Sequence, residues 1–198
     1  FSSVEKILEP KSVAIILDTR ESCEEIADWI VKGFSESVVI TNYGILPSGS
    51  MPILLDNFNA DLGVIISASH NPSEYNGIKL IGKSGSKLDD DLEIKIEREL
   101  NNINLPDNNP KIKNSNKGYE AYLHYLKNVN NLKFDKFDLV IDASNGSAFK
   151  IIEDLLSSKS AKFKLISNKP NGKNINENCG ATFPENLQKN ISNGQVGI

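Results

Sequence analysis

Residues 67–80, with the sequence SASHNPSEYNGIKL, combine side chains that could carry out a group transfer. Ser69 could act as a nucleophile or carry the transferred group. That chemistry calls for donors that stabilise developing negative charge, a group that takes or gives a proton, and a cation for phosphate oxygens. His70, Asn71 and Lys79 provide those types. The combination favours a functional loop, whereas a single loop serine or lysine is usually structural.

A serine hydrolase is a weaker interpretation of the same residues. Ser69 and His70 are adjacent, so their side chains can hardly hydrogen-bond to each other as a catalytic triad requires. His124 is the only other histidine in the sequence. The residues of this loop therefore suit the transfer of a charged group better than hydrolysis by a catalytic triad.

The apolar run before this loop predicts the strand that presents it. Residues 62–68, LGVIISA, are almost continuously apolar, which is typical of a strand covered on both faces. Similar runs at 13–17 and 38–40 predict two more strands, and the alternation with helices favours right-handed crossovers on a mainly parallel sheet. Ligands bind at the carboxyl ends of such strands, where loop amides and helix amino termini converge. The loop at 67–80 leaves one of those ends.

Helical spacing marks the segments between and after these strands. Ser22 and Glu25 form a capping-box pattern that predicts the start of the first helix. The buried face of this helix is predicted to consist of Ile26, Trp29, Ile30 and Phe34. A second helix is expected at 51–58, followed after the loop by a hairpin of residues 77–82 and 86–88.

The composition changes at residues 101–117, where Asn, Pro and Lys replace apolar residues, as is typical of a linker or long surface connection. We therefore divide the chain into a first α/β domain, residues 1–115, which contains the loop at 67–80 with Ser69, and a second α/β domain, residues 116–198, truncated at its C-terminal side. The expected fold class is α/β, with mainly parallel or mixed sheets flanked by helices, in two consecutive domains of which the second is incomplete.

The second domain repeats the alternation of strands and helices. The expected elements are a helix at 119–129, strands at 137–144 and 163–167 with a helix between them, a short helix capped by Thr182 and Glu185, and a strand that begins in QVGI at 195–198. Residues 170–182, PNGKNINENCGAT, are interpreted as an interdomain loop near the active cleft.

The composition excludes several classes of protein. The formal net charge of −4 and the pI near 5.3 argue against a surface for nucleic acid or an anionic membrane, which needs a concentrated positive field. Cys23 and Cys179 lie far apart, so we expect reduced thiols rather than a zinc site or a disulfide. The aspartates at 89–91 are interpreted as a helix amino terminus in preference to a metal site. No segment resembles a membrane helix or signal peptide, which predicts a cytoplasmic protein.

The string SASHNP followed by YNGIKL closely resembles the active-site serine loop of the α-D-phosphohexomutases. The other matching motifs occur in the order and rough spacing of that family: DTR at 18–20, GSKL at 85–88, DASNG at 142–146, and PNGKNINENCGAT at 170–182. Within the family, these motifs are most similar to the phosphoglucosamine mutase branch. Its members interconvert glucosamine 6-phosphate and glucosamine 1-phosphate.

The resemblance implies that Ser69 is a phosphoserine that gives its phosphoryl group to the substrate and takes one back. Lys79 corresponds to a lysine that transfers a proton or stabilises charge. His70 and Arg20 are implied as further catalytic residues, the arginine by holding the phosphoserine region. The implied partner is a small phosphosugar, with a hexose 1,6-bisphosphate as activator.

Asn71 and Asn76 are implied to bind substrate or to position the loop. The resemblance also implies a Mg²⁺ cofactor, with the phosphate of Ser69 as one ligand. The aspartate-rich loop that supplies the other ligands would follow QVGI, which ends this sequence, so we expect this chain to be inactive alone. Ser48 and Gly49 stand where the branch commonly has a Thr-Pro pair.

Two alternatives stay open at this stage. The preferred sugar could be mannose or glucose phosphate, because the segments that select the sugar in the family are not in this sequence. A non-catalytic phosphosugar-binding module that kept the loop is the second alternative. A homodimer is compatible with the sequence, which does not determine the oligomeric state.

Overall fold

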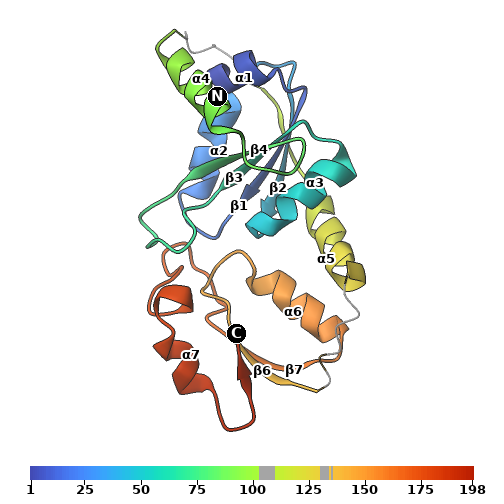
Figure 1. Cartoon of the computed structure of the whole chain (residues 1–198), viewed down its shortest axis with the longest axis vertical. Coiled ribbons are helices and arrows are strands. Elements are labelled where there is room, and N and C mark those ends of the chain that lie inside the picture. Colours follow the sequence, from blue (N-terminus) through green and yellow to red (C-terminus); the bar gives the residue numbers. More distant parts are fainter. Residues whose placement is uncertain (103–109, 130–133, 135) are drawn as a thin grey trace.

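The computed structural model describes residues 1–102, 110–129, 134 and 136–198. The described residues up to 116 make a first α/β unit and those from 134 make a second, and helix α5 (Lys117–Val129) lies alongside both (Figure 1). This arrangement confirms the predicted α/β fold class with sheets flanked by helices. Among the described residues, no helix has both the length and the apolar character needed to cross a membrane.

Five strands form the sheet of the first unit, in the order β4-β3-β1-β2-β5. Their bounds are β1 (Ser12–Leu17), β2 (Val39–Ile45), β3 (Leu62–Ile66), β4 (Ile78–Gly82) and β5 (Ile112–Asn114). β1, β2, β3 and β5 are parallel, whereas β4 runs antiparallel to β3 at one edge. The predicted hairpin forms through β4 and an isolated antiparallel bridge between Ile81 and Lys87.

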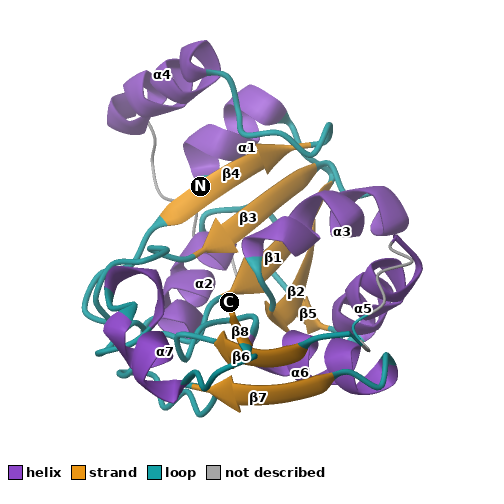
Figure 2. Cartoon of the chain, turned by 60° about the horizontal axis from the view of Figure 1, so that its bottom comes forward, coloured by secondary structure: helices purple, strands orange, loops and turns teal. Residues whose placement is uncertain are grey.

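Helices cover both faces of this sheet (Figure 2). Those of the first unit are α1 (Ser2–Leu8), α2 (Cys23–Lys32), α3 (Met51–Phe58) and α4 (Asp90–Glu99). On one face, Ile15 and Val64 pack in a cluster with α2, α1 and α4. On the other face, Ile16 and Ile65 pack against α3, and Tyr119 of α5 joins that cluster. The strands read as continuous apolar runs because successive side chains point to opposite faces and both faces are covered.

The first crossover helix differs from the prediction in its cap and in its buried face. Ser22 is the N-cap of α2 with helical backbone angles and no capping hydrogen bond; its Oγ instead accepts a hydrogen bond from Asn76 Nδ2 at 2.9 Å. The predicted capping box of Ser22 and Glu25 is therefore wrong. The prediction that Trp29 belongs to the buried face is also wrong, since this residue is 60% exposed. The buried stripe of α2 consists of Cys23, Ala27, Ile30 and Val31.

The segment predicted to be a linker contains a strand. β5 pairs with β2 in parallel, and Ile112 packs against the core of the first unit. Residues 103–109 of the same segment lie outside the described residues. The domain boundary between residues 115 and 116 stays a prediction; α5, which would open the second domain, contacts α3 of the first unit and α6 (Phe149–Ser158) of the second.

The second unit has a three-stranded parallel sheet in the order β7-β6-β8. Besides α6, its elements are β6 (Asp138–Asp142), β7 (Lys162–Ile166), α7 (Glu185–Asn190) and β8 (Val196–Gly197), and each corresponds to a predicted element. The capping box predicted for α7 is wrong, because Thr182 ends a 3-10 turn and Pro184 occupies the N-cap position. Leu139, Ile141 and Leu156 form the core of this unit.

Candidate active site

The serine loop, residues 67–77, begins where β3 ends and returns at the start of β4. The Ser67 amide donates to the Gly77 carbonyl oxygen at 2.8 Å, which closes the base of the loop. A Cβ at Gly77 would lie 3.1 Å from the Ser67 carbonyl oxygen, so the closed base disfavours any larger residue there. Ser69 is exposed, has a left-handed φ of 56°, and its amide donates to Ser67 Oγ at 3.1 Å. The loop therefore exposes Ser69 on a base that main-chain hydrogen bonds hold closed.

Arg20 holds the serine loop from beneath. Its side chain is 0% exposed, and its Nε donates to Asp18 Oδ2 at 2.9 Å. The other N–H groups of the guanidinium donate to main-chain carbonyl oxygens of the loop: those of Ser69 (3.1 Å), Asn71 (2.8 Å), Pro72 and Tyr75 (2.8 Å). Every N–H of the guanidinium thus has an acceptor within the protein. Arg20 is placed to position the loop, and the catalytic role implied for it stays a prediction.

Asp18, Cys23 and Asn76 form the layer beneath the loop. Asp18 is 4% exposed, and its Oδ1 accepts hydrogen bonds from the Arg20 amide at 3.0 Å and from the Cys23 thiol at 3.1 Å. Asn76 Nδ2 donates to Cys23 Sγ at 3.3 Å, while its Oδ1 accepts from the Gly77 amide at 2.8 Å. Burial raises the pKa of the Cys23 thiol to about 11, so the thiol stays protonated near neutral pH. Asn76 is therefore placed to anchor the end of the loop on α2.

A cavity of about 310 Å³ lies between the serine loop and the second unit. Its lining residues from the first unit include Ser67, Ser69 and His70, and those from the second unit include Ser147 and Asn176. The loops that meet there follow β1, β3 and β6, the last of which leads into α6, and residues of the segment 170–182 complete the wall. Ser69 and His70 are thus brought to a hollow at the carboxyl ends of parallel strands, where ligands of α/β proteins bind.

The residues that line this cavity do not include the other predicted site residues, Arg20, Asn71, Asn76 and Lys79. Lys79 lies on β4 opposite Ile65, with an exposed side chain on the sheet face that α3 covers. Asn71 is exposed, and it contributes its main-chain carbonyl to the contacts of the loop with Arg20. The roles predicted for these side chains stay predictions.

The second unit contributes a contact that the sequence analysis does not identify. Asn176 Nδ2 donates to the carbonyl oxygens of Ser69 at 3.0 Å and of Asn71 at 2.9 Å. Asn176 belongs to residues 170–182, which we expect near the active cleft, so the segment was recognisable. Asn176 could not be recognised individually as a functional residue, because a single asparagine in an Asn-rich sequence does not stand out from the others.

Asp142 holds the segment that carries Asn176. Its carboxylate accepts hydrogen bonds from the amides of Ser144 at 2.9 Å and Gly180 at 3.0 Å, and from Asn186 Nδ2 at 2.9 Å. Burial of Asp142 disfavours its charged form, but the hydrogen bonds from Gly180, Ser144 and Asn186 outweigh that effect and hold the pKa of Asp142 below its usual value. An ionised Asp142 therefore ties this segment to the end of β6.

Comparison with known proteins identifies the family. Residues 2–107, more than half of the chain, match phosphoglucomutase/phosphomannomutase, alpha/beta/alpha domain I. The chain belongs to this family, the α-D-phosphohexomutases. The resemblance of the serine loop is confirmed at the level of the family.

Two similar relatives of this phosphohexomutase chain are phosphoglucosamine mutases. The protein of Clostridioides difficile (strain 630) is 35% identical over 195 residues, and that of Thermosipho africanus (strain TCF52B) is 36% identical over 190 residues. Each match covers 94% of this chain and 44% of the relative. A solved phosphoglucomutase/phosphomannomutase family protein from Burkholderia thailandensis has the same fold, with a TM-score of 0.78 at 18% identity over 99% of this chain and 46% of that one. This chain thus spans less than half the length of these proteins.

The described residues of this phosphohexomutase chain do not make up a magnesium site. No group of three or more His, Cys, Asp or Glu side chains among them could hold a metal ion. Asp18, the carboxylate beneath the serine loop, is already paired with Arg20. Magnesium is bound through carboxylate and phosphate oxygens, and these residues do not supply a set of carboxylates for it.

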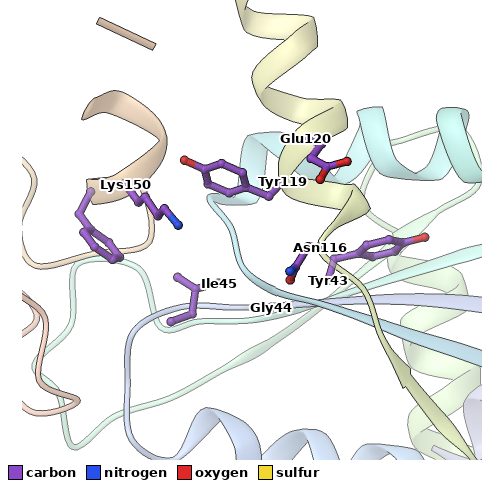
Figure 3. Close-up of a pocket in the computed structure, with 8 residues that line it drawn as sticks. Tyr43, Gly44, Ile45, Asn116, Tyr119, Glu120 and Lys150 are labelled. Atoms are coloured by element: carbon purple, nitrogen blue, oxygen red, sulfur yellow. The ribbon is translucent and has the colours of Figure 1, made fainter. Parts of the chain in front are cut away.

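A second hollow, of about 410 Å³, lies between the end of β2, α5 and α6 (Figure 3). Lys150 and Tyr119 face each other across it, with Lys150 Nζ 5.2 Å from the centre of the Tyr119 ring. The Tyr119 hydroxyl donates to Asp154 Oδ2 at 2.6 Å, which joins α5 to α6. None of the predicted site residues lines this hollow. It is part of the seam between the two units.

Proposed function

We propose that this chain supplies the serine loop of a phosphoglucosamine mutase, an enzyme that interconverts glucosamine 6-phosphate and glucosamine 1-phosphate. The observation that carries the proposal is the placement of Ser69, exposed in a cavity on a loop whose carbonyl oxygens the buried Arg20 holds. The 35% and 36% identity to phosphoglucosamine mutases supports the choice of an amino sugar. Since the chain spans 44% of those relatives, the activity of a whole enzyme is part of the proposal.

The proposed reaction consists of two phosphoryl transfers. In the first, the bond between phosphorus and Ser69 Oγ breaks as a hydroxyl oxygen of the phosphosugar bonds to phosphorus; the hydroxyl loses its proton and Ser69 Oγ gains one. The product is a bisphosphorylated sugar. In the second transfer, Ser69 Oγ loses its proton and takes the other phosphoryl group, while the released sugar oxygen gains a proton. The phosphoserine is regenerated, and only the position of the phosphate on the sugar has changed.

The residues of the loop have distinct parts in this scheme. We assign Lys79 to proton exchange or charge balance, and His70 to a hydrogen bond beside the phosphoserine. Phosphoryl transfer passes through a loose transition state, so correct positioning supplies much of the rate. The contacts of Arg20 with four carbonyl oxygens of the loop support that requirement, because they restrict where Ser69 Oγ can move.

A glucose or mannose phosphate is the second candidate substrate. The family domain that matches residues 2–107 is described for phosphoglucomutase and phosphomannomutase, which favours keeping these sugars in the test. Both candidates share the phosphoserine step and differ only in the sugar that discharges it.

Mass spectrometry of the natural full-length protein tests the proposal. We expect one phosphate on the peptide that holds Ser69, its loss in Ser69→Ala, and its retention in the control Ser73→Ala from the same loop. Glucosamine 6-phosphate should discharge it faster than the glucose or mannose phosphates. An unmodified Ser69 that also takes no phosphate from a hexose 1,6-bisphosphate in the presence of Mg²⁺ would contradict the proposal and favour a phosphosugar-binding module.

A further inference from the structure

We propose that Asn176 is a positioning residue for phosphoryl transfer, through which the second unit holds the serine loop of the first. This inference rests on the proposed function of Ser69. Asn176 Nδ2 donates to the carbonyl oxygens of Ser69 at 3.0 Å and Asn71 at 2.9 Å. These residues are more than a hundred positions apart in the sequence, so only the packing of the two units brings them together.

The two carbonyl oxygens that Asn176 contacts are also contacted by Arg20. Arg20 Nη2 lies 3.1 Å from the Ser69 oxygen and 2.8 Å from the Asn71 oxygen. Because a carbonyl oxygen has two lone pairs, it can accept one hydrogen bond from each donor. The Ser69–His70 and Asn71–Pro72 peptide groups are therefore held from beneath by the first unit and from the side by the second.

The orientation of Ser69 depends on the first of these peptide groups, which adjoins it. Ser69 has a left-handed φ of 56°, which non-glycine residues adopt only when their surroundings impose it. The direction of its Cβ and Oγ follows from the planes of the adjoining peptides. Fixing the Ser69 carbonyl from two sides restricts the rotation that would carry Oγ away from a ligand in the cavity.

The Asn176 side chain is directed by a firmly held backbone. The Asn176 amide donates to the Ser144 carbonyl oxygen at 2.9 Å, and the neighbouring Ile175 is 5% exposed. Asn176 has a φ of 59°, a conformation that asparagine, aspartate and glycine tolerate better than other residues. Asn176 also lines the cavity that Ser69 enters. The residue is thus placed to act on the loop while the segment around it stays folded.

Substitutions at Asn176 can remove the contact with little strain. Asn176→Gly keeps the backbone conformation and deletes the donor. Asn176→Asp keeps the size of the side chain and replaces the Nδ2 donor with an oxygen that repels the two carbonyl oxygens. Asn178→Gly is the matched control, since Asn178 has a φ of 51° in the same segment, is exposed, and makes no side-chain hydrogen bond within the described residues.

The first measurement is amide hydrogen exchange in the 198-residue chain. We expect Asn176→Gly and Asn176→Asp to speed exchange of the Ser69, Asn71 and Tyr75 amides at least about fivefold, the factor that corresponds to about 1 kcal/mol, the contribution of one of the two hydrogen bonds that are lost. The melting temperature should fall by no more than about 2 to 4 °C, the shift that a loss of about 1 kcal/mol causes in a protein of this size, and β1 and β6 should stay protected from exchange. Exchange of the loop amides at the rate of the Asn178→Gly control would overturn the inference.

The second measurement is a single-turnover transfer of phosphate from a hexose 1,6-bisphosphate to Ser69 in the natural full-length protein. We expect both Asn176 variants to lower the maximal rate about tenfold and to leave the half-saturating concentration unchanged, because Asn176 acts on the loop rather than on the sugar. An unchanged maximal rate would overturn the positioning role. No phosphate uptake by the unsubstituted protein would overturn the proposed function and the transfer role with it, while the exchange measurement would still decide whether Asn176 orders the loop.

Discussion

The Thr19 hydroxyl donates a hydrogen bond of 2.6 Å to the Asn145 carbonyl oxygen, across the junction of the two α/β units. Both residues are buried, and each follows the end of a strand, β1 or β6. Thr19 is the neighbour of Arg20, whose guanidinium holds the serine loop. The turn that contains Thr19 and Arg20 therefore contacts both the serine loop and the second unit. The geometry of the candidate site thus depends on how the two units pack.

Replacing Arg20 by lysine should lower the free energy of unfolding of the chain by about 2 kcal/mol or more. One ammonium group cannot reach the Asp18 carboxylate and the carbonyl oxygens of the loop together, so buried acceptors lose their donors. Urea denaturation measures the change. Arg98→Lys, at the other arginine of the sequence and exposed on α4, should change stability by less than about 0.5 kcal/mol. Equal losses in the two variants would contradict the role assigned to Arg20.

Gly180→Ala should destabilise the chain more than Gly194→Ala. Both glycines have a positive φ, 73° and 85°, so each alanine pays a similar backbone penalty of about 1 kcal/mol. At Gly180 the new Cβ would also lie 2.2 Å from Ser144 Oγ, whereas nothing lies within 4 Å at Gly194. We expect a further loss of about 1 to 3 kcal/mol at Gly180 from this overlap, measured by thermal or urea unfolding. Similar losses at both positions would show that Ser144 moves aside freely.

Asp142 should contribute to the acid sensitivity of the fold. Its pKa is below the usual value in the folded chain, so its stabilising effect is present above the unfolded pKa of about 3.9 and is lost as the pH falls through the lower folded pKa. Asp142→Asn should be less stable at neutral pH, and its urea midpoint should fall less steeply than that of the unsubstituted chain below about pH 4. Parallel curves for the two proteins would contradict this assignment.

Both thiols should be unreactive in the folded chain. Cys23 and Cys179 are 1% and 2% exposed, and burial raises the pKa of each, that of Cys23 to about 11. At pH 8 we expect an aromatic disulfide reagent to titrate no thiol rapidly in buffer and both in urea. Rapid reaction of Cys23 in the folded chain would show that the layer beneath the serine loop opens, and rapid reaction of Cys179 would show that the segment 170–182 opens.

Local patterns predict most of the elements but not all of their contacts. The apolar runs of β1, β2 and β3 identify strands because both faces of the sheet are covered. The capping box at Ser22 fails because its hydroxyl accepts from Asn76, a residue of the serine loop that local sequence does not place beside it. β5 was missed because a three-residue strand in an Asn- and Lys-rich segment has no periodic signal, and only pairing with β2 defines it.

The candidate site divides in the same way. The string around Ser69 identifies the serine loop and the family, since the side-chain types and their order along one short segment carry that information. The sequence by itself therefore determined the loop, the strand before it and the α/β class. Only the tertiary structure decided that every N–H group of the Arg20 guanidinium is hydrogen-bonded beneath the loop, that Lys79 lies outside the cavity, and that Asn176 contacts the Ser69 carbonyl oxygen from the second unit. The physical reason is that contacts between segments remote in the chain depend on the order of strands within a sheet and on how the two units pack, and no local periodicity records either.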